Sequence, residues 1–189
     1  MEALRQKIIR EATYTSDGNI NVDSFLNHQV DTQLLGAMAD ELSKRLDLTG
    51  VTKVLTAETS GIAMAAICAY RMGLPLVYAK RVRSEPSTAP VYKSTVFSFT
   101  YQRPTTFVCA REYLSADDTV LIVDDFLAGG QSMRGLVDIV RQSGATLSGI
   151  AVAIEKKFEG GGDRLRAEGY HVEALATITK VDKTGFTFL

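Results

Sequence analysis

Cysteine is scarce in this sequence. The two cysteines, Cys68 and Cys109, lie far apart, and neither has a second cysteine or a histidine at the spacing of metal ligands. Free cysteine commonly behaves as a small apolar core residue, so we expect both thiols to be buried. Such thiols suit a reducing compartment, and we expect a cytoplasmic protein.

Long apolar runs and an excess of one charge are also missing. The chain has 21 Lys and Arg against 22 Asp and Glu, a formal net charge of -1, so nothing draws it onto nucleic acid or an anionic membrane. The longest apolar runs, such as residues 62–70, are far shorter than a membrane span. Residues 1–12 lack the apolar stretch of a signal peptide. We therefore expect a soluble protein with small-molecule partners.

The length and the order of apolar segments favour one α/β domain over residues 1–189. A chain of 189 residues that is 46% hydrophobic can bury a core of ordinary size. Asp31 can cap a helix whose apolar residues recur at three- and four-residue steps from Leu34 to Leu46. Strands are expected at residues 53–57, 76–79, 120–123, 149–155 and 170–178, and helices at residues 62–72, 132–142 and 163–168. This alternation predicts a central, mostly parallel sheet flanked by helices, with ligands at the carboxyl ends of the strands.

Two segments depart from this alternation. Residues 80–92 are charged or carry serine and proline, with almost nothing apolar to anchor them, so we expect a mobile loop. Residues 96–99 and 106–109 are typical of a hairpin joined through Gln102, Arg103 and Pro104.

The strongest chemical signal is one strand-to-helix turn that holds two acids and two glycines. Four apolar β-formers run directly into Asp124 and Asp125, and Gly129 and Gly130 follow before a helix begins. Glycine allows successive backbone N–H groups to converge on a phosphate, and the helix N-terminus adds its dipole. Acids beside a phosphate need another task, such as accepting hydrogen bonds from ribose hydroxyls or holding a metal. Taken alone, the pattern is explained more simply by a helix cap beside a flexible turn.

The whole segment 120–132, however, resembles the signature with which type I phosphoribosyltransferases bind 5-phosphoribosyl pyrophosphate (PRPP). This resemblance implies the type I phosphoribosyltransferase fold, with Asp124 and Asp125 as catalytic residues at the ribose 2- and 3-hydroxyls. The residues implied to wrap the 5-phosphate are Ala128, Gly129, Gly130, Gln131 and Ser132. Many members have Thr-Gly-Gly-Thr where residues 129–132 are Gly-Gly-Gln-Ser, so the backbone contacts carry over more directly than the side-chain contacts.

The resemblance extends to the side of the site that meets pyrophosphate. The residues implied to form the pyrophosphate loop are Glu58, Thr59, Ser60 and Gly61. Residues 80–92 resemble the family's flexible lid, in which Lys80, Arg81 and Arg83 are candidates to neutralise pyrophosphate. Taken alone, the turn would be an ordinary helix cap and each cation a solvated surface charge.

The match to bacterial members of the family that act on xanthine runs the whole length of the chain. It implies a hood over the base, formed by about residues 1–30 and the C-terminal region, and contacts from Ile20, Asn27 and Lys156 to xanthine. Ile20 can supply an apolar wall, Asn27 offers a donor and an acceptor, and Lys156 can donate to a 6-oxo group. Without the resemblance, Asn27 would be read as a turn residue and Lys156 as a surface charge.

The resemblance thus implies transfer of the phosphoribosyl group of PRPP to xanthine in purine salvage, giving xanthosine 5'-monophosphate and pyrophosphate. It also implies Mg2+ carried with PRPP, no metal site built by the protein alone, and a homodimer in which residues 80–99 approach the partner's active site. The alternatives are a guanine, hypoxanthine or adenine phosphoribosyltransferase and a PRPP-sensing regulator without turnover. A regulator would need a DNA-binding module, and neither a helix-turn-helix extension nor a basic face is visible. A response-regulator-like domain would leave Gly129 and Gly130 unexplained.

Overall fold

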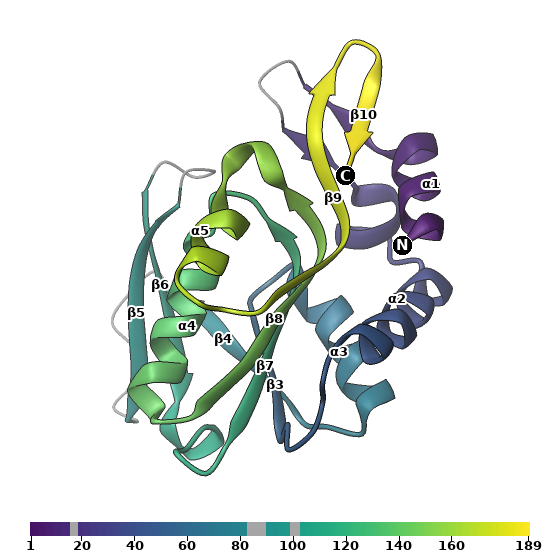
Figure 1. Ribbon diagram of the computed structural model, residues 1–189. Coiled ribbons are helices and arrows are strands. Elements are labelled where there is room, and N and C mark those ends of the chain that lie inside the picture. Colours follow the sequence, from purple (N-terminus) through teal and green to yellow (C-terminus); the bar gives the residue numbers. More distant parts are fainter. Residues whose placement is uncertain (16–18, 83–89, 99–102) are drawn as a thin grey trace.

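The structure, a computed structural model, describes residues 1–15, 19–82, 90–98 and 103–189 (Figure 1). The helices are α1 (Glu2–Glu11), α2 (Thr32–Arg45), α3 (Gly61–Met72), α4 (Gln131–Ser143) and α5 (Gly161–Ala167). The strands are β1 (Thr13–Tyr14), β2 (Ile20–Asn21), β3 (Lys53–Ala57), β4 (Leu76–Val82), β5 (Val91–Ser98), β6 (Arg103–Ala110), β7 (Thr119–Leu127), β8 (Thr146–Lys156), β9 (Val172–Asp182) and β10 (Gly185–Phe188). Within these ranges no helix combines the length and the apolar character needed to cross a membrane.

The described strands form an eight-stranded sheet in the order β10-β9-β8-β7-β3-β4-β6-β5, and β1 and β2 form a separate two-stranded ribbon. The centre of the large sheet, from β9 to β4, is parallel. Strand β10 lies antiparallel at one edge, and the β5–β6 hairpin lies antiparallel at the other. The predicted mostly parallel α/β sheet is confirmed.

Both faces of the parallel centre are covered by helices, which explains why its strands are nearly continuous apolar runs. Val54, Leu121 and Val123 point into a core shared with α2 and α3. Leu55 and Ile122 point the opposite way, into a core with α4 and α5. The two thiols lie in these cores, one in each, and burial raises the pKa of Cys68 to about 12 and that of Cys109 to about 11. The expectation of buried cysteines is confirmed.

Local signals mark where two helices begin or end, and the cap predicted at Asp31 is confirmed. The Asp31 carboxylate accepts a hydrogen bond from the Leu34 N–H at 3.0 Å, so Asp31 is the N-cap of α2. Gly73 ends α3 in the left-handed conformation, with φ of 67°, which glycine adopts without steric cost. Asp31 thus fixes where α2 begins, and Gly73 fixes where α3 ends.

The two ends of the chain pack together (Figure 1). Leu4 and Ile8 of α1 are fully buried in the core that contains Ile178 of β9. The ring centroids of Tyr14 and Phe186 are 5.2 Å apart, which joins the β1–β2 ribbon to the β9–β10 hairpin. The sequence did not indicate β1, β2 or the π-helical turn Asp23–Asn27 that follows them. Residues from both termini thus lie side by side, as the expected hood requires.

The predicted boundary between β4 and the loop after it is wrong. Strand β4 continues to Val82, because β6 pairs with it antiparallel and sets Lys80 opposite Val108. Strand β5 begins at Val91, and Pro104 belongs to β6 instead of the connection. Lys80, Arg81 and Tyr92 are therefore strand residues. The rest of the expected lid, residues 83–89 with Arg83, lies outside the described residues, as do Phe99 and Gln102 of the expected hairpin.

The turn predicted at residues 124–131 begins later than expected. Strand β7 continues through Asp124 and Asp125 to Leu127, because β8 continues alongside it and pairs Asp124 with Val152 and Phe126 with Ile154. Polar and charged residues do not end a strand when the neighbouring strand still offers its backbone groups. The acid pair consequently has the fixed geometry of a strand end.

Candidate active site

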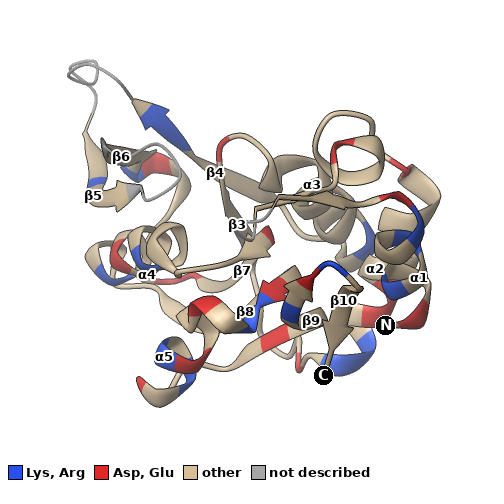
Figure 2. Ribbon diagram, turned by 90° about the horizontal axis from the view of Figure 1, so that it is seen from above, with Lys and Arg blue, Asp and Glu red and all other residues tan. Residues whose placement is uncertain are grey.

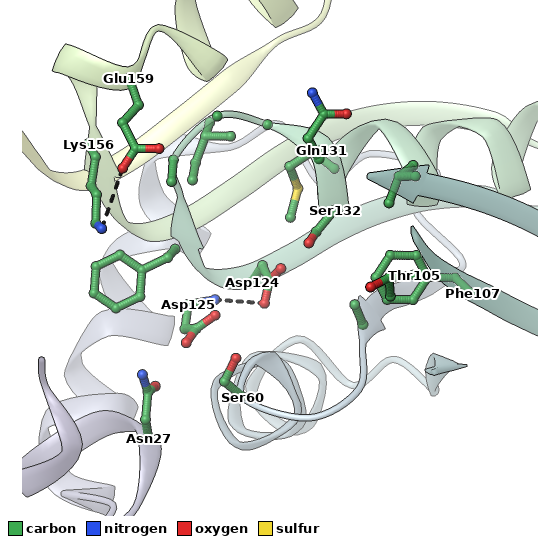
Figure 3. A pocket seen from close by; sticks show the side chains of 18 of the residues that line it. Asn27, Ser60, Thr105, Phe107, Asp124, Asp125, Gln131, Ser132, Lys156 and Glu159 are labelled. Carbon is green, nitrogen blue, oxygen red and sulfur yellow. Dashed lines mark hydrogen bonds and ion pairs between the residues drawn. The ribbon is translucent and has the colours of Figure 1, made fainter. Parts of the chain in front are cut away.

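The carboxyl ends of β3, β7 and β8 border a cavity of about 300 Å³ (Figure 3). The predicted site residues that line it are Ile20, Asn27, Glu58, Ser60, Arg81, Asp124, Asp125, Ala128, Gly129, Gly130, Gln131, Ser132 and Lys156. Thr59, Gly61 and Lys80 are not among its lining residues. The structure therefore brings the ribose, phosphate and base residues predicted from the sequence to one cavity, together with part of the pyrophosphate set.

Two carboxylates lie at the centre of this cavity. Asp124 and Asp125 are each only 5% exposed, and the Asp125 N–H donates to Asp124 Oδ1 at 3.0 Å. Burial, and next the charge of Asp125, raise the pKa of Asp124 well above its ordinary value, whereas the charge of Arg81 acts in the opposite direction. Neighbouring like charges in a buried site are held at an energetic cost, which is typical of a functional site.

Because Gly61 has no side chain, the start of α3 can lie against the Asp124 carboxylate. A Cβ at Gly61 would lie 2.1 Å from Asp124 Oδ1 and 2.4 Å from Thr56 Oγ1, so a side chain here would displace the Asp124 carboxylate and the Thr56 hydroxyl. Gly61, expected in the pyrophosphate loop, thus packs against the acid pair instead of lining the cavity.

The end of β3 and the end of β4 are joined beside the acid pair. The Arg81 N–H donates to Glu58 Oε2 at 2.7 Å, and the Glu58–Thr59 peptide bond is cis. The Arg81 guanidinium lies 5.9 Å from the centroid of the Phe107 ring. Lys80, one residue earlier in β4, points to the other face of the sheet, as alternation along a strand requires, and lines a separate groove. Of the two described cations predicted to meet pyrophosphate, only Arg81 reaches the cavity.

The turn between β7 and α4 brings the N-terminus of a helix to the cavity. Gly130 has φ of 82° and is the N-cap of α4, so the chain enters the helix through a conformation that favours glycine. Gln131 and Ser132 form the first helical turn at the cavity wall, where the helix dipole is positive. The phosphate cradle predicted from the two glycines thus has its expected surroundings.

Lys156 lies on the other side of the acid pair. It is the last residue of β8, whereas the strand expected from the sequence ended one residue earlier, at residue 155. Its Nζ lies 5.7 Å from the centroid of the Phe126 ring and 3.5 Å from Glu159 Oε1. Ile20 and Asn27 line the same cavity from the N-terminal segment. Figure 3 shows the Asn27 side chain. An aromatic ring, a cation and an amide around one space suit a flat, polar-edged ligand.

Nine lining residues were not predicted from the sequence. They are Asn19, Ala57, Val96, Thr105, Phe107, Phe126, Leu127, Met133 and Glu159. Two of them had a usable signal, since Phe126 directly follows the acid pair and Glu159 lies three residues after Lys156. Val96, Thr105 and Phe107 reach the cavity from the β5–β6 hairpin, which only the sheet order places there.

The fold has clear relatives among solved structures. The chain superposes on adenine phosphoribosyltransferase from Trypanosoma brucei with a TM-score of 0.80 at 17% identity, covering 96% of this chain and 82% of that one. The Giardia lamblia enzyme gives a TM-score of 0.78 at 18% identity, covering 94% and 98%. The fold is therefore that of the type I phosphoribosyltransferases.

Sequence comparison defines the family. Residues 21–179 match the phosphoribosyl transferase domain. The chain is 44% identical to the xanthine phosphoribosyltransferase of Heliobacterium modesticaldum and 43% identical to that of Pseudomonas savastanoi pv. phaseolicola, with complete coverage of both chains. This chain belongs to the phosphoribosyltransferase family.

The buried acid pair predicts an unusual pH dependence of stability. Because the folded-state pKa of Asp124 is raised, the stability present below its unfolded-state pKa, about 4, is lost as the pH rises through the folded-state pKa. Asp124→Asn carries no charge, so its free energy of unfolding should exceed that of the wild type at neutral pH. Urea unfolding between pH 5 and 9 measures this, with the exposed Asp117→Asn as control. A parallel pH dependence in wild type and Asp124→Asn would contradict the assignment.

Proposed function

We propose that the protein transfers the 5-phosphoribosyl group of PRPP to xanthine, giving xanthosine 5'-monophosphate and pyrophosphate. The observation that carries this proposal is the buried pair Asp124 and Asp125 between a phosphate cradle and a base-sized space around Lys156. The full-length similarity to relatives named xanthine phosphoribosyltransferase supports the choice of base. The proposal includes a cytoplasmic location, which the free, buried thiols support.

The proposed roles follow from the positions of the residues. Residues 128–132 hold the 5-phosphate with backbone N–H groups and the dipole of α4. Asp124 and Asp125 accept hydrogen bonds from the ribose 2- and 3-hydroxyls, and their charge favours the positive ring that develops as the bond to pyrophosphate loosens. Glu58, Ser60 and Arg81 face the leaving group, while Thr59 and Gly61 shape that turn. No protein nucleophile is needed, because the leaving group is already good.

Magnesium is proposed to arrive with PRPP. Among the described residues, no three His, Cys, Asp or Glu side chains are gathered as a metal site. Asp124 and Asp125, two of the four carboxylates that line the cavity, are oxygen ligands suited to a divalent cation held jointly with substrate. When bound, Mg2+ would offset the charge of the pyrophosphate.

Nucleotide formation from PRPP, Mg2+ and each purine base tests the function directly. We expect the double variant Asp124→Asn/Asp125→Asn to lose about a hundredfold or more in kcat/KM, because charge stabilisation at the ribose is removed. Its melting temperature should not fall, since the acid pair is not what holds the fold. Full activity in the double variant would exclude the acid pair from the reaction, and no nucleotide from any base would exclude the function.

We also predict that xanthine is preferred over guanine and hypoxanthine and that adenine is rejected. Lys156 can donate to the 6-oxo group of the three oxopurines but meets a donor on adenine. Lys156→Ala should lower kcat/KM for the oxopurines by about tenfold to a hundredfold, and Asn27→Ala should narrow the preference among them. The adjacent Lys157, which is paired with Asp163 and does not line the cavity, gives the control Lys157→Ala. A higher kcat/KM with guanine or hypoxanthine than with xanthine would contradict the proposed base preference. It would leave the proposed PRPP chemistry unaffected.

A homodimer is proposed from a surface groove that is separate from the active-site cavity. A groove of about 670 Å³ runs over β4 and β6 on the face away from α4, lined by Leu76, Tyr78, Lys80, Val82, Val91, Val108 and neighbouring residues. No described helix covers it. We propose that a second copy packs here and brings residues 80–99 of each subunit toward the partner's active site.

Light scattering at micromolar concentration should give about twice the chain mass of 20.6 kDa. Tyr78 is 42% exposed in the groove, so Tyr78→Glu should produce monomers with reduced activity. Tyr70→Glu, at an 80% exposed tyrosine on α3, should leave the dimer intact. A fully active monomer of the wild type would refute the dimer.

A further inference from the structure

Helix α5 lies directly behind the phosphate turn, although none of its residues lines the cavity. The Gly161 N–H donates to the Ala128 carbonyl at 3.1 Å. The Arg164 guanidinium donates to the Gly129 carbonyl at 3.0 Å. Two successive carbonyl groups of the phosphate turn are therefore held by one turn of α5.

The two backbones touch where these bonds form. A Cβ at Gly161 would lie 2.1 Å from the Ala128 oxygen and 2.6 Å from the Gly130 nitrogen. A Cβ at Gly130 would lie 3.2 Å from the Gly161 Cα. Residues 128–130 can rest on α5 this closely because Gly161 carries no side chain, and a side chain at Gly130 would also crowd the contact.

The orientation of the peptide planes gives this contact a function. The peptide bonds of the turn are trans, so each C=O and the N–H of the next residue point in opposite directions. With the carbonyls of Ala128 and Gly129 turned toward α5, the N–H groups of Gly129 and Gly130 are turned away from it. Both glycines line the cavity.

Arg164 also joins the phosphate turn to the base side of the cavity. Its guanidinium donates to the Glu159 carbonyl at 3.0 Å, and the Glu159 carboxylate pairs with Lys156. One side chain thus binds both the turn after β7 and the turn after β8.

Helix α5 is itself fixed to the sheet. Arg166 binds the carboxylate of Glu155 with two hydrogen bonds of 2.7 and 2.9 Å, and Glu155 is only 1% exposed. A Cβ at Gly162 would lie 1.9 Å from Glu155 Oε1, so the helix starts directly on this carboxylate. Both charge signs mark α5 in Figure 2. The support behind the phosphate turn therefore does not depend on the turn itself.

We propose that Gly161 and Arg164 are positioning residues for the 5-phosphate: they hold the turn 128–130 with its N–H groups directed at the ligand before the ligand arrives. This inference rests on the proposed function, because it assigns α5 to the phosphate end of PRPP. Without Arg164, binding must first order the turn, and that cost appears in the affinity for phosphate-bearing ligands. Arg164 does not line the cavity, and it binds the backbone carbonyl of Glu159 and not the carboxylate that pairs with Lys156, so the xanthine KM should change little.

The test compares Arg164→Met, which keeps the long stem but donates no hydrogen bond, with Arg164→Lys, which keeps the charge and one donor group. Arg141→Ala, which removes an arginine bound to the Tyr170 hydroxyl, is the control. The measurements are KM for PRPP, KM for xanthine, kcat, melting temperature, and the Kd of ribose 5-phosphate by calorimetry.

We expect Arg164→Met to raise the PRPP KM and the ribose 5-phosphate Kd by about tenfold to a hundredfold. The xanthine KM should stay within about twofold, Arg164→Lys should recover part of the loss, and the control should behave as wild type. An unchanged ribose 5-phosphate Kd in folded Arg164→Met, or equal increases in both KM values, would overturn the proposal. If the wild type makes no nucleotide from any base, the proposed function fails, and the ribose 5-phosphate Kd still decides the role of Arg164.

Discussion

Two adjacent carboxylates at the end of β7, each almost completely buried, are the constraint around which the structure is arranged. Burial, and next the repulsion between the two like charges, raise the pKa of Asp124, and the raised pKa records the cost of holding this pair. Such a pair stays in place only if the backbone around it is fixed. Strand β8 supplies that rigidity, because its parallel pairing holds β7 up to Leu127, and β3 pairs with the other edge of β7 up to Ile122.

Three glycines let helices α3 and α5 pack closely against the ends of β7 and β8 and against the turn after β7. Gly61 brings the start of α3 against Asp124, Gly161 brings α5 against the phosphate turn, and Gly162 brings α5 against Glu155. In each case a single methyl group would overlap the atoms it faces. Close packing of helix starts on strand ends is thus the common device that positions the acids, the phosphate turn and the base side.

The remaining wall of the cavity comes from the N-terminal segment. Ile20 and Asn27 lie on the ribbon and the π-helical turn that precede α2, and the same segment packs on the C-terminal hairpin. The proposed base contacts of Ile20 and Asn27 therefore depend on the two termini folding together, whereas Lys156 comes from β8. The proposed phosphate and ribose contacts depend on the sheet and on α3, α4 and α5.

The sequence by itself determined the α/β class, the strand at Lys53–Ala57, the cap at Asp31 and the succession of Asp124, Asp125, Gly129 and Gly130 between one strand and the helix that follows it. These features are local, because apolar periodicity, caps and glycine turns are written in neighbouring residues. Only the tertiary structure decided that β4 extends through Arg81, that Lys80 faces away from the cavity, and that Val96, Thr105 and Phe107 line the cavity. It likewise decided that Gly61 packs against Asp124 and that Arg164 binds the Gly129 carbonyl, although neither residue lines the cavity. Such facts depend on which strand pairs with which and on contacts between residues far apart in the chain, and no local pattern encodes them.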